Sequence, residues 1–320
     1  MSEEIEKGFE HFLYLPPEIR MMMIEKMEPE DKCRLTRCSM ACNKEAKNSK
    51  NYVHSLVILD ECDNSIRIDI RHSKEEKGYS LSFVKNDSGG NDNVIYYDAN
   101  FRELWRKKFD DSQSAFVLAA EKFKKLLEIH QNKIRCLVAI GDRQREFDFE
   151  IKQLKNLEKL SLTDGIGFSK IVPKLRRPLN HLCIYGRAID VSDFQEIYQV
   201  KDSLELRDTN MTYEQMIRLS APEVVLSIGD STEIDIYNFI KSWKNGTLGK
   251  EVKKYTWIRY DESIFDISKL FRLFGASFDE TQGTIDLYNK NGICAKLSYI
   301  DQFFSPKLTF EVKIDQQLHQ

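Results

Sequence analysis

The sequence predicts an α/β (mixed) fold, in which a small N-terminal module of three helices precedes a larger domain of degenerate strand and helix repeats that ends in a β-hairpin. Two observations support this prediction. Helix-start signals are crowded into the first fifty residues, and five later segments share a Leu-x-x-Leu-x-Leu rhythm. At 320 residues the chain is long enough for one small module and one larger domain.

The composition is that of an ordinary globular protein, with 41% hydrophobic and 31% charged residues. The net charge of -3 provides no general attraction for nucleic acid or for an anionic membrane, so we expect neither as a partner. The N-terminus is acidic, and no apolar run approaches the roughly 20 residues of a spanning helix. The 7 cysteines lie mostly within apolar patterns and predict reduced thiols, hence a cytoplasmic or nuclear protein.

The first predicted helix begins near Pro17, because proline fits the first helical turn and Glu18 complements the positive end of the helix dipole. Its apolar residues recur at helical spacing and predict one buried stripe, formed by Ile19, Met23, Ile24 and Met27.

Two more short helices are expected, one starting at Pro29-Glu30-Asp31 and one capped by Ser39. Three short helices cannot enclose a full core, so we expect them to need a partner surface.

In order and spacing, Leu15-Pro16-Pro17-Glu18-Ile19 and the apolar residues that follow it match a known motif, and residues 9–55 resemble an F-box. In that family this segment binds a Skp-type adaptor, which bridges to a cullin-based ubiquitin ligase. The family usually has valine at the place of Cys38 and tryptophan at the place of Cys42. The resemblance implies that the adaptor-binding residues are Leu15, Pro16, Pro17, Glu18, Ile19, Ile24, Met27 and Leu35. A helical cap that seals the repeat domain would show the same apolar stripes.

The rest of the chain, residues 56–320, reads as strands and helices. Period-two patterns predict strands at 56–59, 66–70, 79–83 and 94–97, and a helix around 113–130 precedes a buried strand at 134–140. Beyond these, Leu160, Leu182, Leu204 and Leu226 follow one another at intervals of 22 residues, and Tyr255 comes 29 residues later. This spacing is typical of leucine-rich repeats.

Helical patterns fill the gaps between these segments, with a possible capping box at Thr212 and Gln215 and a helix that ends at Gly246. Stacked strand and helix units predict a parallel sheet backed by helices, with a curved face left for binding. Asn291-Gly292 predicts the hairpin, and a final strand is expected from Leu308 to Ile314.

This order of elements is similar to the large nematode F-box families that carry an F-box-associated C-terminal domain. The resemblance implies that residues 56–320 bind a client protein, whose identity and contact residues the sequence does not define. The chain would then be the substrate-recognition subunit of a cullin-type ubiquitin ligase. The alternative is a non-catalytic, leucine-rich-repeat-like interaction scaffold that acts outside a ligase.

No enzyme is predicted. Thr163-Asp164-Gly165-Ile166-Gly167 lacks the third glycine and the Gly-Lys-Ser/Thr of a phosphate loop, so a strand-end turn is the better interpretation. The six histidines show no triad or metal signature, and we nominate no catalytic residue and no cofactor. Cys33, Cys38 and Cys42 lack the spacing of zinc ligands and are expected to be core thiols.

Overall fold

The fold is described from a computed structural model, which divides into two compact units, Met1–Leu157 and Glu158–Gln320. The predicted division after residue 55 lies within the first unit and stays a prediction. The residues that the structure describes are 12, 14–27, 35, 54–62, 65–71, 78–85, 93–97, 103–108, 115–130, 134–140, 154–163, 175, 177–185, 194–207, 211–227, 232–248, 251–259, 265–275, 283–301 and 305–313.

The sheet of the first unit combines an antiparallel meander with one parallel strand, in the order β6-β1-β2-β3-β4-β5. Strand β6 runs parallel to β1, and each of the other neighbours is antiparallel. The strands are β1 (Ser55–Cys62), β2 (Ser65–Arg71), β3 (Gly78–Val84), β4 (Asn93–Tyr97), β5 (Glu103–Lys108) and β6 (Cys136–Ile140), and the helices are α2 (Pro17–Lys26) and α5 (Ala115–His130).

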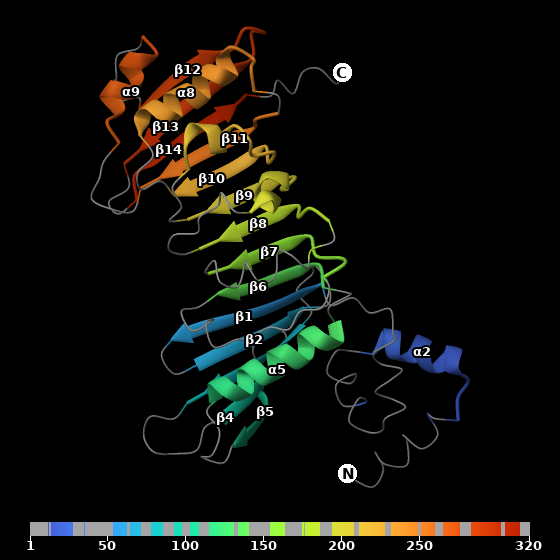
Figure 1. The fold of residues 1–320 in the computed structure, drawn as a ribbon. Helices are drawn as coiled ribbons and strands as arrows, with labels where there is room; N and C mark the ends of the chain where they lie inside the picture. The colour runs from blue at the N-terminus through green and yellow to red at the C-terminus, as the bar shows by residue number, and fades with distance from the viewer. Residues whose placement is uncertain are drawn as a thin grey trace. The chain divides into compact units, whose positions relative to one another are not determined.

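Apolar and polar residues alternate along β2, and α5 covers the apolar face. Ile66, Ile68 and Ile70 point to one face of β2 and are each at most 1% exposed. Helix α5 buries Phe123 and Leu127, four residues apart on one helical face, and lies against β2 and β3 (Figure 1). The expected strands and the helix are therefore present. Strand β5 was not predicted, because its charged sequence resembles a solvated surface and strands at a sheet edge are often charged.

The sheet of the second unit is also mixed, in the order β12-β13-β14-β11-β10-β9-β8-β7. Five strands run parallel, and the other three continue the sheet antiparallel beyond β11. The strands are β7 (Lys159–Leu162), β8 (His181–Ile184), β9 (Ser203–Leu206), β10 (Glu223–Ser227), β11 (Lys254–Ile258), β12 (Thr284–Tyr288), β13 (Cys294–Ile300) and β14 (Lys307–Val312). The helices are η4 (Gln195–Gln199, a 3-10 helix), α7 (Tyr213–Met216), α8 (Glu233–Lys244) and α9 (Ile267–Leu273).

The leucine rhythm marks the positions that the parallel strands bring together. Leu160 pairs with Leu182, which pairs with Leu204 in the next strand. Leu204 then pairs with Val224, two residues before the Leu226 that the rhythm indicated. The 22-residue interval between paired positions therefore ends at Leu204, because the connection from β9 to β10 is two residues shorter than the connection from β8 to β9.

Aromatic side chains fill the core between α8 and the sheet. Phe239 lies 4.4 Å from Tyr255 and 5.8 Å from Trp257 between ring centroids, and Trp243 meets Phe310 of β14 edge to face at 4.9 Å. Figure 1 shows α8 lying across these strands, with α9 beside it. Helix α8 stops where expected, with Asn245 as its C-cap and Gly246 at a φ of 64°.

The predicted fold class is wrong. Within the described residues, fourteen strands in mixed sheets dominate and α-helices are few, whereas the prediction was a three-helix module followed by leucine-rich-repeat-like units. In the described part of the connection from β8 to β9, the helical segment is a five-residue 3-10 helix, and α7 has four residues. In the Leu-x-x-Leu-x-Leu rhythm, the alternation of apolar residues indicates which face of a strand is buried. It does not distinguish regular repeats from a mixed sheet.

Candidate functional site

The Leu-Pro-Pro-Glu segment forms a tight helix start. Pro16 is the N-cap and Pro17 the first helical residue of α2, and the carbonyl of Pro16 accepts hydrogen bonds from the amides of Ile19 and Arg20, both at 3.0 Å. The Arg20 guanidinium donates to the carbonyl of Leu15 at 2.7 Å. These bonds fix the backbone at the point where the motif turns into the helix, as the sequence predicted.

One side of α2 packs in a small hydrophobic core. Ile24 and Leu35 are fully buried, and Phe12 is 6% exposed. Leu15 and Met27 pack against this cluster and are partly buried. The helix is thus held by apolar contacts within the N-terminal segment itself.

The other side of α2 is apolar and open. Ile19, Met22 and Met23 are 39%, 47% and 40% exposed, respectively. They are three and four residues apart, so they share one helical face, which we call the exposed α2 face. An exposed face of three large apolar side chains on one short helix is typical of an interaction surface.

The structure therefore divides the predicted adaptor-binding residues into two groups. Pro16, Pro17, Glu18 and Ile19 are exposed, whereas Leu15, Ile24, Met27 and Leu35 belong to the small core. The expected buried stripe was wrong about Ile19 and Met23, which are both exposed, and Met22 was not nominated. The predicted stripe placed Met23 on the same face as Ile19, and helical spacing of three residues from Ile19 would have added Met22 to that face.

Several expectations about this segment lie outside the described residues. These are the helix starts at Pro29-Glu30-Asp31 and Ser39, and the thiols of Cys33, Cys38 and Cys42. Within the part of the chain that the structure covers, no group of three or more histidine, cysteine or acidic side chains is placed to hold a metal ion. None of the helices described combines the length and apolar character needed to cross a bilayer.

The second unit contains a serine, a histidine and an aspartate in contact. His181 Nδ1 lies 2.8 Å from Ser203 Oγ, and His181 Nε2 lies 3.8 Å from Asp202 Oδ2. The second distance is too long for the hydrogen bond that orients a catalytic histidine, and both side chains are about half exposed. The group is better explained as a polar contact between neighbouring strands, and the absence of catalysis stays a prediction.

The sheet face that carries His181 and Ser203 lies opposite the aromatic core. On this face, the strand register places charges of alternating sign side by side on neighbouring strands. Two ion pairs form near β11, β14 and β12, Lys254–Glu311 at 3.4 Å and Lys313–Asp286 at 2.9 Å. Opposite charges on neighbouring strands attract each other, which is typical of a solvated face. The charges that alternate are Asp286, Lys296, Glu311, Lys254 and Glu223.

A buried thiol on this face predicts a pH effect on stability. Burial raises the pKa of Cys183 to about 12, whereas the unfolded chain ionises near 9.0. In the folded state the Cys183 thiol therefore stays protonated to a higher pH than in the unfolded chain. The stability that it contributes is complete below about pH 9 and is lost as the pH rises towards 12. The urea midpoints of the wild type and Cys183→Ala should therefore converge or cross between pH 8 and 10.5. A difference that stays constant over this range would contradict the prediction.

No protein-family model, no curated protein and no solved structure matches this chain. The functional argument therefore depends on the N-terminal motif and on the exposure of α2.

Proposed function

We propose that this protein is a substrate-recognition subunit of a cullin-type ubiquitin ligase, which binds a Skp-type adaptor through its N-terminal segment and a client protein through the remainder of the chain. The observation that carries this proposal is the exposed α2 face of Ile19, Met22 and Met23, which directly follows the Leu-Pro-Pro-Glu motif. These side chains lose contact with water only if another surface covers them. The catalytic step belongs to other subunits.

The small core also supports this role. Because Phe12, Ile24 and Leu35 already hold α2 within the N-terminal segment, its open face does not have to stabilise the local fold. A binding surface that is preorganised in this way loses less conformational entropy on association.

An alternative function is a non-catalytic scaffold that acts outside a ligase. It is favoured by the finding that four of the eight residues expected to contact the adaptor contribute to the local core. Under this alternative, the N-terminal helices only complete the fold of the chain.

Co-purification distinguishes the two. The full chain, co-expressed with a Skp-type adaptor, should elute with it as a one-to-one complex in size-exclusion chromatography at micromolar concentration. Circular dichroism and cooperative melting confirm that the chain used is folded. A folded chain that elutes separately from the adaptor at these concentrations would favour the scaffold.

A further inference from the structure

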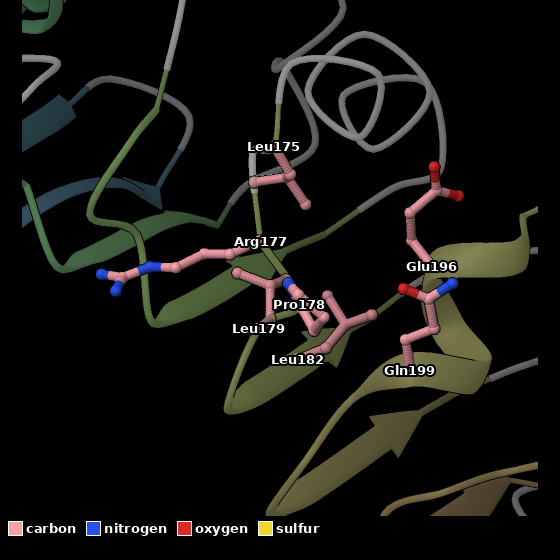
Figure 2. Close-up of a pocket in the computed structure, with 7 residues that line it drawn as sticks. All are labelled: Leu175, Arg177, Pro178, Leu179, Leu182, Glu196 and Gln199. Carbon is pink, nitrogen blue, oxygen red and sulfur yellow. The ribbon is translucent and has the colours of Figure 1, made fainter.

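A small cavity opens within the second unit, between the segment that leads into β8 and the 3-10 helix η4. Its volume is about 180 Å³. Its wall combines apolar side chains from one side with polar side chains from η4 (Figure 2). The lining residues are Leu175, Arg177, Pro178, Leu179, Leu182, Glu196 and Gln199.

The floor of the cavity is fixed. Leu179 and Leu182 are 3% and 2% exposed, and Leu182 is held in the parallel sheet by its pairing with Leu160 and Leu204. The long helix α8 covers the equivalent part of β11 with aromatic rings. Helix η4 has only five residues and buries Ile197 and Tyr198, so it covers less of the neighbouring sheet.

The polar side of the cavity is negative. Among the described residues, the side chains of Glu196 and Gln199 make no hydrogen bond or ion pair, and Figure 2 shows both on the η4 side, across from the leucines. Two described arginines, Arg177 and Arg218, are engaged with other groups. The guanidinium of Arg177 points away from the other lining residues and lies 4.0 Å from Glu158. Arg218 donates to Gln195 and stacks over the ring of Tyr198, 4.2 Å from its centroid.

The size of the cavity restricts its occupant. Drug-sized pockets have volumes of about 300 Å³ or more, whereas an engineered cavity of about 150 Å³ holds a benzene molecule. The space therefore admits one side chain. A leucine floor with a carboxylate and an amide oxygen at the rim suits an aliphatic stem that ends in a cation.

We infer that this cavity receives a lysine side chain of a partner protein, with its methylene groups on Leu179 and Leu182 and its ammonium group donating to Glu196 and Gln199. A partly exposed ion pair contributes little by itself, so a free amine binds only weakly and the backbone of a protein supplies the remaining contacts. The inference does not depend on binding of a Skp-type adaptor, because the cavity and α2 belong to different units.

Titrations followed by leucine-methyl NMR test the chemistry of the site in the full chain. The probes are lysine with an acetylated N-terminus and a methylamide C-terminus, the same compound acetylated at Nζ, and n-butylammonium. Capped lysine should shift the methyl signals of Leu179 and Leu182 and bind more tightly than n-butylammonium, which lacks a peptide backbone. Acetylation at Nζ should weaken binding by about three-fold, because it removes the charge.

Variants identify the group that recognises the ammonium. Glu196→Gln should weaken capped lysine by about three-fold and leave the acetylated probe unchanged. The matched control is Glu214→Gln, at an exposed carboxylate on α7 that does not line the cavity. Equal binding of the charged and acetylated probes, loss of affinity in Glu214→Gln instead of Glu196→Gln, or no movement of the Leu179 and Leu182 signals would each overturn the inference.

Discussion

Replacing Arg259 with alanine is expected to lower the free energy of unfolding of the second unit by about 3–5 kcal/mol, because it leaves a carboxylate buried without its partner. Arg259 Nη1 lies 3.4 Å from Glu233 Oε1, and the two side chains are 9% and 12% exposed. The same carboxylate oxygen accepts a hydrogen bond from the amide of Asp266 at 3.0 Å. The guanidinium also stacks on Phe265, 4.6 Å from the ring centroid. The pair thus joins the end of β11 to the start of α8 and to the segment before α9.

The measurement is urea unfolding of the full chain, followed by the fluorescence of Trp243 and Trp257 in the second unit. The matched control is Lys313→Ala, which removes one partner of a 2.9 Å ion pair whose side chains are each 48% exposed. The control should cost less than about 1 kcal/mol, since exposed pairs are screened by water. The interpretation fails if Arg259→Ala costs no more than Lys313→Ala.

Local sequence signals predicted the individual elements of this fold well. The capping box at Thr212 is present, with the Gln215 side chain accepting from the Thr212 amide at 2.8 Å. The hairpin at Asn291-Gly292 is also present, with Gly292 at a φ of 77° and the Asn289 side chain holding the loop. Both depend on residues within five positions of one another, so a single stretch of sequence contains the necessary information.

Long-range arrangement could not be predicted in the same way. The strand predicted from Leu308 is present as β14, but its place in the sheet was not predicted: it lies between β11 and β13, and its Phe310 meets Trp243 of α8. Nothing in the local pattern of 308–314 specifies that contact. The buried Arg259–Glu233 pair was missed for the same reason, since its members are polar residues far apart in the sequence.

The candidate docking surface illustrates a further limit of periodicity. The pattern correctly predicted a helix from Pro17, but α2 carries apolar side chains on both sides, and sequence alone did not decide which side packs inward. Contacts with Phe12 and Leu35 decide this, because they cover Ile24 and leave Ile19 and Met23 exposed.

That division leads to the prediction with the largest expected effect on binding. Replacing Ile19 and Met23 together with alanine should weaken a complex with a Skp-type adaptor by at least about ten-fold, because apolar anchors at the centre of an interface carry most of its energy. The free energy of unfolding should stay within about 0.5 kcal/mol of the wild type, since both side chains are exposed. Isothermal titration calorimetry measures the affinity, and urea unfolding measures the stability.

Two further variants separate binding from folding. Ile24→Ala removes a fully buried side chain, so it should cost about 2–5 kcal/mol of local stability and weaken the adaptor complex only through the loss of folded helix. Ile234→Ala removes an isoleucine that is 50% exposed on α8 and should change neither quantity. If the pair Ile19→Ala and Met23→Ala binds the adaptor as tightly as the wild type does, the exposed α2 face is not the docking surface. The apolar side of α2 that faces Phe12 would then account for the N-terminal motif through folding alone, as the scaffold alternative requires.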